Sequence, residues 1–271
     1  MAVTRNPNLG PSQMRARRRR LFFVRFYIIL FLLLFIVLGL AIFSGSDKLK
    51  IQTIIVSGNA AVSSDNILSI ANRDMTGRYG YLFSKSNSVI FPRFQIKKDL
   101  LNEIKTIKDL DISWDDWQQI SIMITERKPH SVWCDQTSNC YFVDKDGYIY
   151  SQAPVFTGSM FIKAYGNVAT STGPIGQSFL SKHTYEEIFI LIDLMDQKNI
   201  KINSVSFDGA DYRFNLESGP VIIFNTTNSF EQSFNNLFGA IETKNLDLEK
   251  DVSVIKYIDL RFDNKIVVGK K

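Results

Sequence analysis

The longest hydrophobic run in the chain lies near its N-terminus. Residues 26–43 read FYIILFLLLFIVLGLAIF and contain no charged side chain. As a helix this run spans about 27 Å, and adding residues 21–24 covers the roughly 30 Å hydrocarbon core of a bilayer. We therefore interpret residues 21–43 as an uncleaved transmembrane helix. The alternatives are a cleaved signal peptide and a twin-arginine export signal, which the Arg19-Arg20-Leu21-Phe22-Phe23 run resembles.

The next part of the chain alternates between the hydrophobic period of strands and that of helices. Its elements follow in the order β-α-α-β-β, which predicts one layer of helices packed on a small sheet. The second helix is expected to bury a face made of Ile96, Leu100, Leu101, Ile104 and Ile107. The predicted ranges, in chain order, are 49–59, 61–75, 96–107, 110–114 and 120–127, with a loop at 77–88.

After Pro129 the pattern changes to short strands separated by turns, with two helices among them. Predicted strands lie at 131–134, 140–144, 148–151, 202–208, 211–218 and 220–226, and helices at 183–199 and from Ser229. Residues 256–262 and 265–271 predict a closing hairpin around Asp263-Asn264. The fold class predicted for the chain is therefore α+β: one transmembrane helix, a β-α-α-β-β domain, and a β-rich domain with flanking helices.

Charge is distributed unevenly, which changes how the overall basicity is interpreted. Seven of the 32 Lys and Arg residues precede residue 44, and no acid does. The other 25 bases face 27 acids, so the rest of the chain carries a net charge of −2. This balance argues against nucleic acid as a partner. Residues 1–20 instead predict a basic cytoplasmic tail, which places the chain after residue 43 outside the membrane.

The two cysteines, Cys134 and Cys140, flank a polar turn between two apolar strands in VWCDQTSNCYFV. An exported compartment permits disulfides, and cysteines on paired strands can be bridged. We expect a disulfide here. Two free thiols, or a metal site that also uses His130, are the alternatives, although a fourth ligand is not evident.

The segment ITERKPHSVW holds the residues that look most like a catalytic cluster. Pro129 cannot continue a central strand, so the segment is interpreted as a joint between domains, with Glu126 and Arg127 at the strand's exit, solvated or paired with neighbours. No phosphate-binding glycine loop or HExxH motif occurs. We predict no catalytic, cofactor-binding or metal-binding residues. Trp114, Trp117 and Trp133 are expected in the core or at the joint, with an exposed Trp117 as the alternative. Tyr79, Tyr81 and Phe83 are expected to pack, with a lipid- or partner-facing loop as the alternative.

Four motifs in this order resemble the bacterial FtsQ/DivIB cell-division proteins. They are I-x-x-I-x-V-x-G-N from Ile51, I-x-I-x-E-R-x-P-x-x-x-W from Ile122, Y-x-V-D-x-x-G from Tyr141, and YIDLRFDN from Tyr257. Together with the arginine-rich tail and the anchor, the resemblance covers the whole chain. The first motif occurs in many POTRA (polypeptide-transport-associated) domains, so the combination is more specific than any one part.

The resemblance implies a POTRA domain over residues 49–127 and an FtsQ-type β domain over residues 128–271. It also implies a non-catalytic scaffold that links FtsB- and FtsL-like coiled-coil membrane proteins to septal peptidoglycan synthesis, with other division proteins recruited through the POTRA domain. The location implied is the inner membrane at the division septum, single-pass, with the N-terminus in the cytoplasm. Another POTRA-bearing envelope scaffold or transport-assembly protein is the alternative, and an anchored cell-wall enzyme is the second competitor.

In the family the last strands bind FtsB by adding one of its strands to their edge. By position, the resemblance assigns partner contacts to Phe262, Asn264, Lys265, Ile266, Val267, Val268 and Gly269. Lys270 stands where family members can carry tryptophan, so partner geometry there is expected to differ, and the family does not predict the cysteine pair. Independently of the resemblance, a final strand offers an open row of backbone groups, flanked here by lysines that discourage unspecific pairing.

Overall fold

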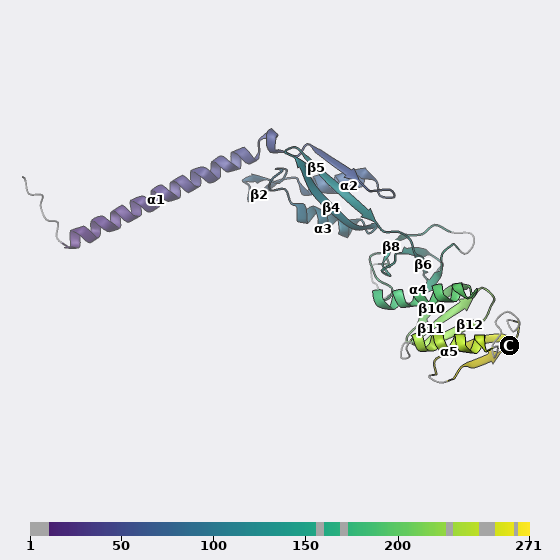
Figure 1. The fold of residues 1–271 in the computed structure, drawn as a ribbon. Helices are drawn as coiled ribbons and strands as arrows, with labels where there is room; N and C mark the ends of the chain where they lie inside the picture. Colours follow the sequence, from purple (N-terminus) through teal and green to yellow (C-terminus); the bar gives the residue numbers. More distant parts are fainter. Residues whose placement is uncertain (1–10, 156–159, 169–172, 226–229, 244–252, 263–264) are drawn as a thin grey trace, which may run out of the picture. The chain divides into compact units, whose positions relative to one another are not determined.

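The computed structural model describes residues 11–155, 160–168, 173–225, 230–243, 253–262 and 265–271. The chain divides into two compact units (Figure 1). The first unit contains residues 1–102 and 109–125, and the second contains residues 103–108 and 126–271. The whole is a mixed α+β protein, as predicted, with a long apolar N-terminal helix followed by an α/β region and a nine-stranded mixed sheet.

The N-terminal helix α1 covers Pro11–Ser44. Its part from Arg18 to Ser44 has the length and composition needed to cross a membrane, and it is the only such helix among the described residues. Nearly all its apolar side chains from Leu21 to Phe43 are exposed, so no protein core accounts for their hydrophobicity. A membrane anchor and a signal sequence both have this character.

The first unit contains a three-stranded sheet in the order β1-β5-β4, accompanied by two helices (Figure 1). Strand β1 runs parallel to β5, with Val56 opposite Ile122. Isoleucines from β4 and β5 meet the buried faces of the helices in the core. The elements are β1 (Thr53–Ser57), α2 (Ser64–Asp74), α3 (Arg93–Glu103), β4 (Ile107–Asp116) and β5 (Gln119–Glu126).

Local chemistry explains how β1 passes into α2. Gly58 has φ +78°, and a Cβ atom there would lie 2.2 Å from the carbonyl oxygen of Ile124, so only glycine fits. The side chain of Asn59 then donates to the carbonyl oxygen of Val62 at 2.8 Å. Ser63 caps the helix by accepting from the backbone N–H of Asn66.

The second helix of this unit was predicted at residues 96–107 and is displaced toward the N-terminus. It begins right after Pro92, whose carbonyl accepts from the N–H of Ile96 at 3.0 Å, and it ends at Glu103. Ile107 opens strand β4 instead of closing the helix. The prediction was wrong because Ile104 and Ile107 are buried and continue the helical spacing, although the chain has already turned into the strand.

Residues 77–88, predicted as a loop, contain the small hairpin β2 (Arg78–Tyr79) and β3 (Phe83–Ser84). The Tyr79–Leu82 turn has Gly80 and Tyr81 both at positive φ, the conformation of a type I′ hairpin turn. Tyrosine is unusual at such a position, which is why the sequence did not predict a hairpin.

The second unit is built on a nine-stranded sheet in the order β14-β13-β12-β11-β10-β9-β6-β7-β8. Antiparallel hairpins dominate, but β9 pairs in parallel with β6 and β10, and β12 with β13. Strand β9 was not predicted, since three residues carry too little pattern. The strands are β6 (Ser131–Cys134), β7 (Cys140–Val143), β8 (Ile149–Gln152), β9 (Lys163–Tyr165), β10 (Ile202–Asp208), β11 (Asp211–Leu216), β12 (Val221–Asn225), β13 (Ile255–Asp259) and β14 (Val267–Lys270).

Two helices, α4 (Lys182–Gln197) and α5 (Phe230–Glu242), complete this unit. They contact each other and share one hydrophobic core with β10 to β13, so both cover the same face of the sheet (Figure 1). Ser181 caps α4, as its side chain accepts from the N–H of Thr184. Ser229, the predicted start of α5, lies outside the described residues.

Candidate functional site

Strand β14 forms one end of the nine-stranded sheet and has a single neighbour in the sheet order, β13. The other end is different. There, Ile149 of β8 donates its N–H to the carbonyl oxygen of Gln177 at 2.9 Å and accepts from the N–H of Gly176 at 2.8 Å. Residues 176–177 therefore cover part of the β8 edge, whereas the structure describes no segment against the outer side of β14. That open edge is the candidate binding site.

The hydrogen bonds around β14 reveal which of its backbone groups face outward. The N–H of Lys271 donates to the carbonyl oxygen of Val254 at 2.8 Å, so this residue points its backbone toward β13. The direction of the backbone N–H and C=O groups alternates along a strand. Those of Val267 and Gly269 therefore face β13, and those of Val268 and Lys270 face away from the sheet. On β13, the N–H of Leu260 donates toward β12 at Ile223, which leaves Asp259 facing β14 and agrees with this assignment.

The side chains of β14 extend the hydrophobic core to the edge of the sheet. Val268 lies opposite Ile258, which is completely buried, yet Val268 itself is 37% exposed. Ile266 packs against the same core. Because residues opposite each other share a face, an added strand would meet an apolar row on the helix-covered face of the sheet. The edge thus offers both backbone groups and hydrophobic surface.

On the other face of this hairpin, Gly269 lies opposite Tyr257. A Cβ atom on residue 269 would stand 2.2 Å from Cε1 of the tyrosine ring, so the ring packs directly over the glycine backbone. Aromatic side chains that cover a glycine on the neighbouring strand stabilise edge pairs in this way. The glycine is therefore required for the local packing of the last two strands.

Arg261 ties the end of β13 to the middle of the sheet. Its guanidinium donates to both carboxylate oxygens of Asp259, at 2.9 and 2.7 Å, and to Asp211 at 2.7 Å. These bonds from Arg261 hold the pKa of the buried Asp259 carboxyl below its usual range and raise the pKa of Arg261. The network fixes the position from which the chain leads toward β14.

The remaining predicted contact residues lie beside this edge. Phe262 is exposed, and the ammonium group of Lys265 lies 5.0 Å from the centre of its ring. Asn264 lies outside the described residues. The structure thus brings Phe262, Lys265, Ile266, Val267, Val268 and Gly269 together in one hairpin, and it assigns outward backbone groups to Val268 in particular.

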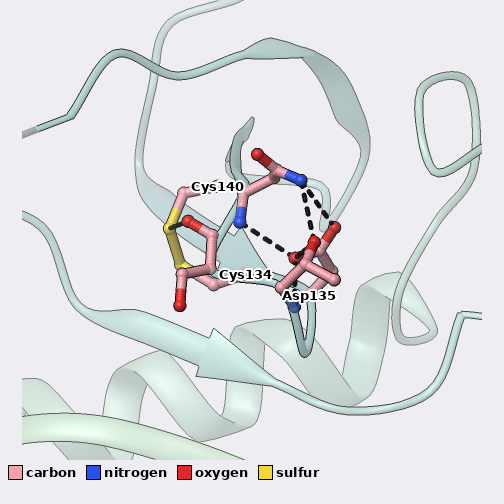
Figure 2. The surroundings of a disulfide bond; sticks show 6 residues. Cys134, Asp135 and Cys140 are labelled. Carbon is pink, nitrogen blue, oxygen red and sulfur yellow. Dashed lines mark hydrogen bonds between the residues drawn. A yellow bond between two sulfur atoms is a disulfide. The ribbon is translucent and has the colours of Figure 1, made fainter.

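Cys134 and Cys140 form a disulfide across the β6–β7 hairpin, where the two residues are paired in register (Figure 2). The turn between them is organised by Asp135. Its carboxylate accepts from the N–H groups of Thr137 and Asn139 at 2.8 and 2.9 Å. Hydrogen bonds, first from the Thr137 hydroxyl and then from Asn139, lower the pKa of Asp135. Among the described residues, no group of three His, Cys, Asp or Glu side chains is placed to hold a metal ion.

The Arg127 side chain, at the exit of β5, is held within the fold. Arg127 is largely buried, forms an ion pair with the buried Asp144 and stacks on the Tyr148 ring at 4.0 Å. Of the two alternatives predicted for the strand's exit, solvation or pairing with neighbours, the structure shows pairing for Arg127. Burial of the Arg127 and Asp144 charges is tolerated because each charge compensates the other.

The imidazole of His130 contacts a side chain of α4. Its Nδ1 lies 3.1 Å from the hydroxyl of Tyr185, and the same hydroxyl lies 2.8 Å from Ser131 Oγ. Burial, with a smaller contribution from Lys145, lowers the pKa of His130, which favours the neutral imidazole at pH 7. Burial raises the pKa of Tyr185, so its hydroxyl remains protonated. These groups link β6 to α4.

The tryptophans divide between the core and the surface. Trp133 is buried, as expected, but Trp114 and Trp117 are about half exposed and contact each other in an edge-to-face pair. The expectation was wrong for Trp114, and Trp117 takes the exposed alternative, because Trp114 lies near the end of β4 and Trp117 in the turn before β5, where side chains leave the core.

Sequence reasoning missed Tyr257 and the Asp211–Arg261 contact. The YIDLRF motif places Asp259 and Arg261 two residues apart, but Asp211 lies 50 positions from Arg261, so no local pattern indicates that contact. Neither the known protein-family models nor the curated proteins include a match to this chain.

Proposed function

We propose that this chain is a membrane-anchored, non-catalytic scaffold of the bacterial cell-division complex, similar to the FtsQ/DivIB proteins. In this proposal residues 21–43 anchor the chain, residues 49–127 are its POTRA domain, and residues 128–271 are the β domain that binds FtsB- and FtsL-like coiled-coil proteins. The binding occurs outside the cytoplasm, where the POTRA domain recruits further division proteins.

The observation that carries the proposal is the open edge of β14. A partner strand can form backbone hydrogen bonds with the outward groups of Val268 and Lys270, and such strand addition provides affinity without a deep pocket. The exposed Val268 and the core-packed Ile266 then favour a partner with apolar side chains on the helix-covered face. Lys265, Lys270 and Lys271 favour acidic residues near the ends of the partner strand.

Two further observations support an anchored, exported scaffold. The apolar helix from Arg18 to Ser44 is long enough to span a bilayer and follows a basic tail that acids do not interrupt. The Cys134–Cys140 disulfide suits an oxidising compartment outside the cytoplasm. The element order of the first unit, β-α-α-β-β apart from the small hairpin, is the order expected of a POTRA domain.

The proposal is tested by a pair of substitutions at one position. Val268→Pro removes an outward N–H and leaves the β13–β14 ladder intact, because proline is tolerated where an edge strand faces away from its neighbour. Val268→Thr keeps the N–H and the side-chain shape. In dividing cells, we expect the proline variant to lose both cell-division function and its partner, and the threonine variant to retain both.

Photo-crosslinking in the full-length protein identifies the partner. A crosslinking residue at Lys270 on β14 should capture a small coiled-coil membrane protein, and the capture should disappear with Val268→Pro. The matched control is the same residue at Gln152, which lies on the opposite edge of the sheet and should not capture that protein. Normal division by the proline variant, with unchanged capture, would contradict strand addition at β14.

A further inference from the structure

A shallow apolar hollow lies beside the last turn of α1 in the first unit. Leu40 and Phe43 of the helix line it on one side, and on the other lies a set of side chains that we term the juxtamembrane surface. This surface consists of Phe83, Val89, Ile90 and Trp117. It therefore continues the apolar surface of the helix onto the domain that follows.

The end of α1 is attached to this surface by specific hydrogen bonds. The side-chain amide of Asn87 donates to the carbonyl oxygen of Ser44 at 3.0 Å, and the N–H of Ser84 donates to Ser44 Oγ at 3.3 Å. Asn87 and Ser44 are both buried. A third bond runs from the Gln118 side chain to the carbonyl oxygen of Asp47 at 2.9 Å, next to Trp117. These bonds hold the juxtamembrane surface at the end of α1, so the depth of this surface in a membrane follows the depth of the helix end.

Exposure of these side chains is otherwise unexplained within the fold. Val89 is 67% exposed, and Ile90 and Trp117 are also exposed. The adjacent hairpin turn presents Tyr81, which is 94% exposed in a left-handed conformation with φ 65°. Non-glycine residues held in this conformation are concentrated at functional sites, because the surrounding structure must offset their strain.

The length of the helix determines the depth at which this surface lies. The uncharged run from residue 26 to 43 covers about 27 Å, slightly less than the roughly 30 Å of hydrocarbon that it must cross. Leu40 to Phe43 therefore lie at the outer boundary of the hydrocarbon, and so do the residues that share their hollow. Trp and Tyr are enriched at this boundary, where the ring is in lipid and its polar atom meets water.

We propose that the juxtamembrane surface lies in the outer lipid interface of the membrane, with Trp117 inserted beside the end of α1. The occupant of the hollow is therefore lipid acyl chains and the adjoining headgroups. This inference rests on the membrane anchoring in the proposed function. It makes the first unit a domain held against the bilayer by its own side chains as well as by its helix.

The test uses tryptophan fluorescence of the full chain reconstituted into phosphatidylcholine vesicles. Brominated acyl chains quench only tryptophans that contact lipid. The wild-type protein is compared with Trp114→Phe/Trp117→Phe, which alters two exposed positions and retains the buried Trp133 as an internal control. Brominated lipid should remove the part of the wild-type emission that comes from Trp117 and leave the emission of the double variant almost unchanged. Trp117→Phe alone should abolish most of the quenching.

Flotation of the same vesicles separates the two proposals. If the chain floats with the vesicles and its emission is unquenched, the anchoring stands and the inference is wrong; the hollow would then be free for a membrane helix of a partner. If the chain does not float, the anchoring itself fails and the inference fails with it. Quenching that is equal in the wild type and in the double variant would also overturn the inference, because it would come from Trp133.

Discussion

At the scale of single residues, the pair Tyr257 and Gly269 determines how β14 packs on its neighbour. Any side chain at position 269 must displace the tyrosine ring, since its Cβ atom would stand 2.2 Å from Cε1. We expect Gly269→Ala to lower the free energy of unfolding by about 1 kcal/mol, the lower end of the range for overpacking, and to weaken partner binding. Thermal unfolding followed by circular dichroism measures the first effect.

Gly239 provides the matched control for this prediction. It lies in helix α5, and nothing stands within 4 Å of a Cβ atom added there. Gly239→Ala should therefore stabilise the protein by up to about 1 kcal/mol through helix propensity. The packing argument at Gly269 fails if both alanine variants change stability in the same direction.

Asp146 is the residue from which we expect the clearest acid sensitivity. Its carboxylate is bound by Lys108 and Lys182, each at 2.7 Å, and these bonds lower its pKa to about 2. A lowered pKa in the folded state means that the contribution is complete above the unfolded value of about 3.9 and is lost as pH falls toward 2. Allowing for solvent screening, the contribution is about 1–2 kcal/mol.

The measurement is the free energy of unfolding between pH 5 and pH 2 for the wild type and for Asp146→Asn. The variant should lose stability at pH 5 and show a shallower decline on acidification. Parallel curves for the two proteins would mean that Asp146 does not link folding to protonation. Asp65, an exposed aspartate near the start of α2, supplies the control substitution, Asp65→Asn.

At the scale of elements, the disulfide controls the β6–β7 hairpin. It closes a loop with a sequence separation of six residues in the interior of the sheet, between β9 and β8. The chain-entropy model for so short a loop gives about 2 kcal/mol of stabilisation. Cys134→Ala/Cys140→Ala should lower the free energy of unfolding by about this amount. A reductant should have the same effect on the wild type and none on the double variant.

Hydrogen exchange measured at single amides identifies the elements that the disulfide stabilises. Loss of the disulfide should increase exchange at the amides of β6 and β7, and amides of α2 in the first unit should be unaffected, because the two hairpin strands belong to the second unit. Uniformly faster exchange in both units would indicate that the disulfide stabilises the whole chain through a single unfolding transition.

Element types were largely predictable, and their boundaries were not. Ile122 and Ile124 alternate with Met123 and Thr125 along ISIMITER, and the structure buries the first pair and exposes the second. In contrast, α3 ends at Glu103 although Ile104 and Ile107 continue its apolar spacing. Where a helix and the following strand bury residues in one core, hydrophobic period alone cannot locate the turn between them.

At the scale of the whole molecule, the proposed anchoring predicts that the arginines before α1 determine the orientation of the chain in the membrane. Four of them are consecutive, residues 17–20, and positive charge next to a membrane helix is retained in the cytoplasm. Replacing these four by serine should increase the fraction of molecules with residues 49–271 in the cytoplasm. In intact spheroplasts, protease added outside should digest the wild-type domains and leave a larger protected fraction of the variant.

The control replaces four exposed lysines that are far from the helix in sequence: Lys128, Lys145, Lys201 and Lys256. Charges this far from a membrane helix have little influence on its orientation, so the protected fraction should match that of the wild type. If both variants change orientation equally, total charge and not the position of the arginines would determine it.

The sequence alone was sufficient for whatever depends on a single element and its neighbours along the chain. The apolar run of α1 and the alternation in β5 belong to this class, because burial on one face is repeated in the residue order. Tertiary structure decided which strand forms the open end of the sheet and which residues from different strands contact each other. Arg261 reaches Asp211 over 50 positions, and Arg127 reaches Asp144 across β6, β7 and the turn between them, so no local period records either contact. The outward backbone of Val268 likewise follows from the bonds that Lys271 and Leu260 make to other strands.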